Sequence, residues 1–164
     1  MVKKIREPPE DYDQHWGFTS FLGKRVLEFG ADWGSTAYYF LEHGAIKVIA
    51  VEGSKESASE LFNNYGSEPD IVCIEKMILS PDDFENLISS YEADIIKVDI
   101  EGAEKHILGV SVDTILKIKE WLVETHSEDL FTKFYDLFIN LGYTVTVHYE
   151  HPAERVKVIW ARRS

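Results

Sequence analysis

From residue 24 onward, short runs of β-branched and aliphatic residues alternate with longer amphipathic stretches. The short apolar runs have the length and composition of buried strands, and they predict strands at residues 25–29, 47–51, 70–75, 94–100 and 120–125. The stretches between them carry apolar residues at helical spacing and predict helices at residues 35–43, 55–65, 82–91, 103–109 and 128–141. This order is typical of parallel strands joined by helical crossovers.

The last part of the chain has a different pattern. Residues 143–149 and 155–161 are two alternating runs separated by residues 150–154, which are too few for a helical crossover and predict an antiparallel hairpin. A mostly parallel sheet that ends in such a hairpin resembles the seven-stranded sheet of class I methyltransferases, whereas dinucleotide-binding folds usually stay parallel. We therefore expect an α/β fold with a doubly wound, mostly parallel seven-stranded sheet.

A chain of 164 residues fits one domain, and we expect residues 1–22 to be a lead-in to a domain at residues 23–164. No apolar run approaches the roughly 18 residues that cross a bilayer. Residues 1–15 also lack the apolar stretch of a secretory signal. These features predict a cytoplasmic protein with no membrane partner.

Charge and cysteine content narrow the classes of partner and site. The net charge of −12 disfavours binding to a phosphate backbone, so no nucleic-acid partner is expected. Cys73 is the single cysteine, which excludes an internal disulfide and a zinc site of several cysteines.

Residues 26–36 have the pattern of an apolar strand, a glycine-containing turn and the start of a helix. Gly30 can adopt positive φ, and the first amides of the following helix can donate hydrogen bonds to a carboxylate or phosphate. The turn lacks the three glycines of the dinucleotide pattern, and Glu28 places a carboxylate where a pyrophosphate would lie. Glu52 ends the next strand about 20 residues later, the spacing at which a carboxylate binds both ribose hydroxyls. The alternative for Glu52 is an exposed carboxylate at a strand end.

The run from Ile95 to Glu104 contains the second candidate site. Lys97 and Asp99 lie on one face of a central strand, where buried charges must pair with each other or face a cleft. Because ligands of open α/β sheets bind beyond the carboxyl ends of the strands, we expect Asp99 and Glu101 to lie beside the ligand.

The segment Lys97-Val98-Asp99-Ile100-Glu101-Gly102-Ala103-Glu104, with the upstream turn at residues 28–34, resembles the signatures of FkbM-type methyltransferases. The resemblance covers residues 24–126. It implies the class I methyltransferase fold, S-adenosylmethionine as cofactor, and methylation of hydroxyl groups of sugars or natural products. The chain departs from the family at Glu28, where Asp is common, at Asp32, where Asn is common, and at the bulky Trp33.

The resemblance implies that Gly30, Ala31 and Glu52 contact the cofactor and that Asp99 lies near the transferred methyl group. Met77, Ile78 and Ser80 follow the third strand, where the adenine rests in this fold, although a core segment and a helix start explain them equally well. The full set of expected cofactor-binding residues is Glu28, Gly30, Ala31, Asp32, Trp33, Gly34, Ser35, Glu52, Gly53, Met77, Ile78, Ser80 and Asp99.

Methyl transfer to a hydroxyl requires a base, and the candidate catalytic residues are Asp99, Glu101 and His126, with no choice among them. Glu124 and His126 alternate along one strand and could bind a metal ion together with Asp99. We favour a polar residue or a substrate contact for His126 and expect no metal. His15, His43, His106, His148 and His151 show no comparable grouping.

The sequence thus predicts a methyltransferase for a small-molecule acceptor, and a homo-oligomer in which a neighbouring subunit completes the pocket is an open option. Two alternatives stay open. One is an inactive cofactor-binding module that serves as an interaction partner, because little sequence beyond the core sheet is left to cover an acceptor. The other is an NAD-dependent oxidoreductase, which the missing third glycine and Glu28 disfavour.

Overall fold

The computed structural model describes residues 11–151 and 156–164, which fall into two compact units divided after Met77. Residues 1–10 of the expected lead-in and Arg155, the predicted start of the last strand, lie outside the described residues. Among the described residues, no helix is long and apolar enough to span a membrane.

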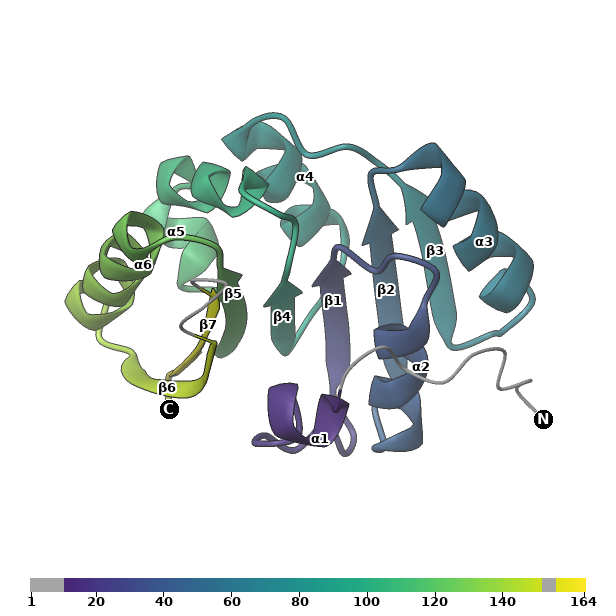
Figure 1. Ribbon diagram of the computed structural model, residues 1–164, viewed down its shortest axis with the longest axis horizontal. Coiled ribbons are helices and arrows are strands. Elements are labelled where there is room, and N and C mark those ends of the chain that lie inside the picture. The colour runs from purple at the N-terminus through teal and green to yellow at the C-terminus, as the bar shows by residue number, and fades with distance from the viewer. Residues whose placement is uncertain (1–10, 152–155) are drawn as a thin grey trace. The chain divides into compact units, whose positions relative to one another are not determined.

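The first unit is built on three parallel strands, β1 (Arg25–Phe29), β2 (Lys47–Glu52) and β3 (Ile71–Glu75). Strand β2 lies between the other two, and the three arrows in Figure 1 point the same way. Aliphatic residues fill the centres of β1 and β2, and nearly all of them are fully buried. Burial of both faces explains why these strands are continuous apolar runs rather than alternating ones.

Three helices complete this unit: α1 (Tyr12–His15), α2 (Ser35–Glu42) and α3 (Lys55–Tyr65). The side chain of Ser54 caps α3 by accepting a hydrogen bond from the Ser57 amide. Within the expected lead-in, Tyr12, Trp16 and Phe21 are buried, so this stretch contributes side chains to the core.

The second unit contains four strands and four helical segments, in the order α4 (Pro81–Ser90), β4 (Ile95–Val98), the 3₁₀ helix η1 (Ala103–Gly109), α5 (Val112–Ile115), β5 (Glu120–Thr125), α6 (Glu128–Asn140), β6 (Thr144–His151) and β7 (Val156–Arg162). Strand β4 pairs with β5 in parallel. Strand β7 lies between β5 and β6 and is antiparallel to both. Strand β6 is therefore an edge strand, and a shift in its register between Val147 and Tyr149 interrupts the pairing with β7.

The seven strands, mostly parallel with a final antiparallel hairpin, confirm the expected fold class. The predicted end of the fourth strand is wrong. This strand ends at Val98 instead of residue 100, because Glu101 and Gly102 both have positive φ and turn the chain. The predicted helix at residues 103–109 is confirmed. It has 3₁₀ geometry, since only seven residues separate that turn from Val110 and short helical pieces often take this form.

Candidate functional site

The turn after β1 is fastened to strand β2 by its backbone. Gly30 has a φ of +83°, and the amides of Gly30 and Ala31 both donate to the carbonyl oxygen of Val51, at 2.9 and 3.1 Å. The left-handed conformation at Gly30 is one that side chains disfavour. Gly30 therefore has the positive φ that the sequence predicts for this turn.

The carboxylate of Glu52 holds two loops together. One oxygen accepts a hydrogen bond from the amide of Asp32 at 2.8 Å, and the other accepts from the amide of Ser54 at 2.7 Å. Asp32 has a φ of +47°, a conformation that aspartate tolerates better than most residues. Glu52 is half-buried, so its carboxylate borders solvent at the end of β2.

Three other predicted cofactor residues make contacts inside the first unit. Glu28 is fully buried and its carboxylate accepts a hydrogen bond from the Thr36 hydroxyl. Trp33 is buried and its carbonyl accepts from the Asn64 side chain at 3.0 Å. The Ser35 hydroxyl lies 2.6 Å from the Tyr12 hydroxyl. Their contact with a cofactor stays a prediction.

Gly34 is the N-cap residue directly before helix α2 and has a φ of +97°. A Cβ atom at this position would lie 2.5 Å from the ring of Tyr65 and 2.8 Å from Leu61, so α3 packs against the bare backbone. No side chain caps the amino terminus of α2, and its first turn contains no acidic residue. The local field at this helix end therefore favours an anionic group.

Gly53 and Met77 are in contact, since a Cβ on Gly53 would lie 2.9 Å from the Met77 sulfur. The side chain of Met77 is 52% exposed. In the second unit, Ile78 is buried and Ser80 is the N-cap residue before helix α4, where its amide and hydroxyl both donate to the Asp83 carboxylate. Capping thus explains Ser80, and an adenine contact at these residues stays a prediction.

In the second unit, Lys97 on β4 is buried, with only 1% of its side chain exposed. Its ammonium nitrogen lies 3.5 Å from an oxygen of Asp99, which directly follows the strand and is about one third exposed. Of the two alternatives for these charges, the structure shows the pairing of Lys97 with Asp99. Asp99 remains accessible to a ligand through its exposed part.

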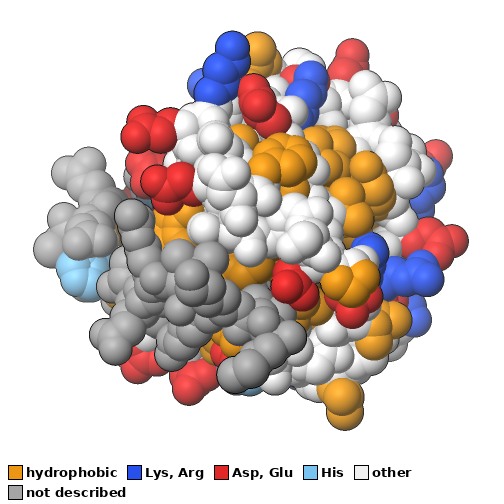
Figure 2. Space-filling view, turned by 90° about the vertical axis from the view of Figure 1, so that its right-hand side faces the viewer, with side chains coloured by type: hydrophobic (Ala, Val, Ile, Leu, Met, Phe, Trp, Pro, Cys, Tyr) orange, Lys and Arg blue, Asp and Glu red, His pale blue; other side chains and the backbone are white. Residues whose placement is uncertain are grey.

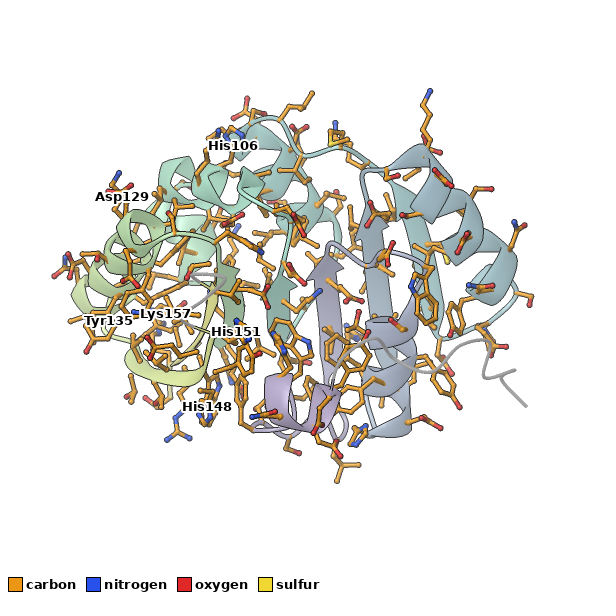
Figure 3. All side chains as sticks on the ribbon, in the orientation of Figure 1. His106, Asp129, Tyr135, His148, His151 and Lys157 are labelled. Carbon is orange, nitrogen blue, oxygen red and sulfur yellow. The ribbon has the colours of Figure 1, made fainter. Side chains whose placement is uncertain are left out.

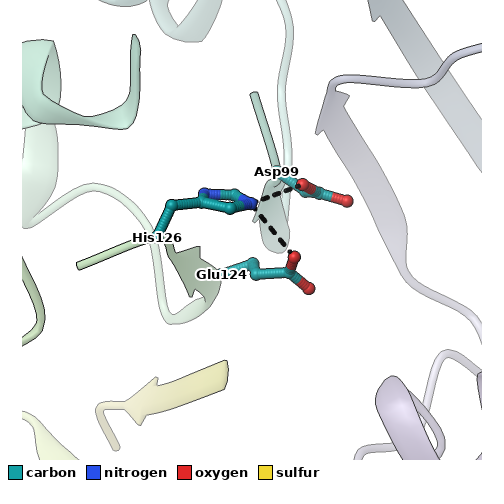
Figure 4. A group of neighbouring side chains, drawn as sticks. All are labelled: Asp99, Glu124 and His126. Atoms are coloured by element: carbon teal, nitrogen blue, oxygen red, sulfur yellow. Dashed lines mark ion pairs between the residues drawn. The ribbon is translucent and has the colours of Figure 1, made fainter. Parts of the chain in front are cut away.

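His126 lies among three carboxylates. Its Nδ1 is 3.1 Å from Oε1 of the fully buried Glu104, and its Nε2 is 3.2 Å from Oε1 of Glu124. The same Nε2 is 3.8 Å from Oδ1 of Asp99 (Figure 4). We call Asp99, Glu104, Glu124 and His126 the carboxylate–histidine cluster.

The carboxylates shift the pKa of the imidazole strongly. Hydrogen bonds that the imidazole donates to Glu104 and Glu124 raise the pKa of His126 to about 10. Burial raises the pKa of Glu104, but its hydrogen bonds to His126 and to the Gly102 amide outweigh burial and bring the net pKa below the ordinary value. Without another cation, His126 therefore carries a proton at neutral pH.

Glu101 is exposed in the turn after β4 and has a φ of +50°, and none of the cluster contacts involves it. Among the other histidines of this unit, Figure 3 shows His106 far from His148 and His151. His148 packs on the Trp160 ring and His151 on the Tyr149 ring. The structure thus brings Asp99 and His126 together and leaves Glu101 apart.

Sequence reasoning did not assign a role to Glu104. Its side chain, on η1, contacts the Gly102 amide and the His126 ring. The turn formed by Glu101 and Gly102, which both have positive φ, precedes η1 and places the side chain there. Periodicity does not predict turns of this kind. The available signal was an acidic residue placed two positions after a glycine that itself follows a strand end.

One relative in sequence is described as uncharacterized protein 65 of Sulfolobus islandicus filamentous virus (isolate Iceland/Hveragerdi). The two sequences are 32% identical over 124 residues, which represent 71% of this chain and 68% of the viral protein. No family model matches the chain.

Solved structures of methyltransferases share the fold. A precorrin-6y C5,15-methyltransferase from Geobacter metallireducens superposes with a TM-score of 0.64 at 16% identity, over 87% of this chain and 81% of that protein. Fibrillarin from Aeropyrum pernix, solved with natively bound S-adenosylmethionine, superposes with a TM-score of 0.63 at 17% identity, over 85% of this chain and 66% of that protein. The chain therefore has the Rossmann-like fold of class I methyltransferases, and nothing in these comparisons indicates the FkbM family in particular.

Proposed function

We propose that this chain, which belongs to the same family as uncharacterized protein 65 of Sulfolobus islandicus filamentous virus, is a methyltransferase that uses S-adenosylmethionine. The fold supports this proposal, because solved proteins of the same fold include methyltransferases and one with the cofactor bound. The observation that carries it is the position and bonding of Glu52 at the end of β2.

Each oxygen of a carboxylate can accept two hydrogen bonds. In Glu52, one acceptor position on each oxygen is used by a backbone amide, from Asp32 or Ser54. The second position on each oxygen remains for the two hydroxyls of a ribose. The same backbone bonds fix the carboxylate in place, so little side-chain freedom is lost when a nucleoside binds.

Calorimetry with S-adenosylhomocysteine tests this role. Glu52→Gln removes one acceptor oxygen and should weaken binding about 10- to 100-fold, the range for hydrogen bonds to a charged group. Glu75→Gln is the matched control, because Glu75 is exposed, pairs with Glu52 in the register of β2 and β3, and loses the same charge. The control should bind as the unchanged protein does.

Three results would count against the cofactor. The folded protein would release no heat with S-adenosylmethionine or its demethylated product, it would bind NADH instead, or Glu52→Gln would bind as tightly as Glu75→Gln. Circular dichroism of each variant shows whether the loops that Glu52 joins are still folded.

We assign the acceptor to small molecules with a hydroxyl group, such as sugars or natural products. The resemblance of residues 97–104 to the FkbM signature supports this class, and the net charge of −12 disfavours RNA. In Figure 2, basic side chains lie among acidic ones and form no continuous patch on the part of that face that the structure describes.

The reaction needs a group that takes the hydroxyl proton. Bound S-adenosylmethionine would supply an activated methyl group, and its transfer to the acceptor oxygen would leave S-adenosylhomocysteine. With its pKa raised to about 10, His126 already carries a proton and cannot serve as the base at neutral pH. Asp99, which is partly exposed, is the better candidate.

An assay with methyl-labelled S-adenosylmethionine and a panel of hydroxylated compounds, amines and RNA tests the acceptor class. Label should enter hydroxylated small molecules, and Asp99→Asn should slow transfer about 100- to 10,000-fold. Transfer to RNA or to amines alone would contradict the assigned class. Normal cofactor binding with no transfer to any compound would favour an inactive interaction module.

A further inference from the structure

We propose that Asp99, Glu124 and His126 bind one divalent first-row transition-metal ion. This inference goes beyond the proposed function, because it concerns the protein without cofactor or acceptor. The three ligand atoms would be a carboxylate oxygen from Asp99, a carboxylate oxygen from Glu124 and Nε2 of His126, which all lie within 4.8 Å of one another.

The distances between these three ligand atoms suit the binding of a single ion by all of them. Ligand atoms that each lie about 2.1 Å from one ion are roughly 3.0 to 3.5 Å apart at octahedral or tetrahedral angles. Nε2 of His126 is 3.2 Å from the Glu124 oxygen and 3.8 Å from the Asp99 oxygen. A shift of a few tenths of an ångström in the partly exposed Asp99 side chain brings the longer distance into this range.

The backbone around the three residues is fixed by the pairing of two strands. Val98 pairs with Val123 in the register of β4 and β5, so Asp99 and Glu124 directly follow a paired position on neighbouring parallel strands. His126 follows the last residue of β5, the fully buried Thr125. Sites built on such elements hold their ligands with little reorganisation.

Glu104 orients the imidazole. Its fully buried carboxylate lies 3.1 Å from Nδ1 of His126 and accepts from the His126 amide at 3.4 Å, which leaves Nε2 as the ring nitrogen that faces Asp99 and Glu124. Metal-bound histidines usually donate their other ring nitrogen to a carboxylate in this way. Glu104 is therefore a positioning residue, and it is the observation that separates this group from an ordinary set of surface carboxylates.

Charge balance also fits a dication. The carboxylates of Asp99, Glu104 and Glu124, opposed by the Lys97 ammonium, leave two negative charges when the imidazole is neutral. One divalent ion neutralises them. A site with an imidazole ligand favours transition metals such as Mn²⁺ or Zn²⁺, whereas Mg²⁺ and Ca²⁺ prefer oxygen ligands alone.

Electron paramagnetic resonance with Mn²⁺ as probe tests the site on the full chain after treatment with a chelator. The signal of free Mn²⁺ should fall with a stoichiometry of one ion per chain. Glu124→Gln and Asp99→Asn should each weaken binding at least about tenfold. Asp129→Asn is the matched control, since it removes the same charge from an exposed residue of α6 and should leave Mn²⁺ binding unchanged.

A further variant tests the orienting role. Glu104→Gln should weaken Mn²⁺ binding about 10- to 100-fold, the range for groups that hold a metal ligand in place. Circular dichroism and thermal melting without metal show whether each variant is folded. Zn²⁺ at equimolar concentration should displace Mn²⁺, and the same concentration of Mg²⁺ should not.

The proposal is overturned if the unchanged protein leaves the Mn²⁺ signal intact at millimolar concentration. It is equally overturned if folded Glu124→Gln binds Mn²⁺ as tightly as Asp129→Asn, or if equimolar Mg²⁺ displaces the ion. Calorimetry with S-adenosylhomocysteine in the presence of a chelator reports on the cofactor separately, so a failure of the metal site and a failure of the proposed function are distinguishable.

Discussion

At Gly34, the effect of one added methyl group on the free energy of unfolding can be predicted. Its φ of +97° is unfavourable for any residue with a side chain, and a Cβ would lie 2.5 Å from the Tyr65 ring. We expect Gly34→Ala to lower the free energy of unfolding by roughly 2 to 5 kcal/mol, from backbone strain and overpacking together. Denaturant unfolding monitored by circular dichroism measures the change.

Gly23→Ala separates the two causes. Gly23 also has a positive φ, of +73°, but apart from its chain neighbours no atom of the described residues lies within 4 Å of the added Cβ. Only the backbone strain remains, so the loss should be about 1 to 2 kcal/mol. Equal losses for the two variants would show that the contact with Tyr65 carries no cost.

The pKa values of His126 and His148 should be shifted in opposite directions from the ordinary value of histidine. Hydrogen bonds that the imidazole donates to Glu104 and Glu124 raise the pKa of His126 to about 10, whereas burial and the nearby charge of Arg162 lower the pKa of His148. In nuclear magnetic resonance spectra of the metal-free protein at pH 8, the ring of His126 should be protonated and that of His148 neutral. A His126 ring that loses its proton near pH 6.5 would contradict the geometry of the cluster.

The raised pKa of His126 determines how the stability of the fold changes with pH. Because the pKa of His126 is higher in the folded chain than its ordinary 6.5, its protonation stabilises the fold fully below about pH 6.5. This stabilisation declines as the pH rises and is lost above about pH 10.

The positions of single residues could be predicted from sequence where the residues belong to a strand or to the turn that follows it. The sequence predicts Glu52 at the strand end that it occupies, and pairing with Asp99 is one of the two alternatives that it leaves for Lys97. Glu104 could not be found, because its contact with His126 joins residues 22 positions apart through a turn. Such contacts depend on tertiary geometry that local patterns do not contain.

At the scale of elements, helix α4 depends on one acidic side chain. The Asp83 carboxylate accepts hydrogen bonds from the amides of Leu79 and Ser80 and from the Ser80 hydroxyl. Asp83→Ala should lower the free energy of unfolding by about 1 to 2 kcal/mol, the range for a lost helix cap. Thermal or denaturant unfolding reports the loss.

Asp82 provides the comparison within the same turn. It is exposed in the first turn of α4, where the helix dipole favours its charge. Asp82→Ala should therefore cost about 0.3 to 0.5 kcal/mol. If the two substitutions had the same effect, the bonds to Leu79 and Ser80 would contribute nothing to stability.

Elements with strong apolar patterns were predictable to the residue. The bounds of β1, β5 and α3 coincide with those expected from sequence. The weak point was the segment after β4, where Ile100 continues the apolar pattern although the chain has already begun to turn. A positive φ at Glu101 is uncommon for a residue with a side chain, so the pattern gave no warning.

At the scale of the whole molecule, the net charge of −12 disfavours the approach of anionic polymers. We expect RNA to bind more weakly than about 10⁻⁴ M even at low salt, because the acidic surface repels a phosphate backbone. Fluorescence anisotropy with a labelled oligonucleotide measures this. Tight binding that weakens steeply with added salt would contradict the expectation and would move the acceptor class toward RNA.

The general architecture was predictable because it follows from two patterns that cover most of the chain, apolar runs at crossover spacing and a short interval before the last strand. The acceptor was not, since nothing in periodicity specifies what binds at the strand ends. Asp99, Glu124 and His126 meet only when β4 and β5 are aligned in register.

The interior position of β7 has a consequence for the route of folding. Strand β7 pairs with β6, its neighbour in sequence, and also with β5, through pairs such as Thr125 and Lys157. A hairpin forms in about 1 to 10 µs, much faster than pairings between distant segments. Strands β6 and β7 should therefore form a hairpin first, and this hairpin should then dock onto β5. Strand β6 thus joins the sheet only through its pairing with β7.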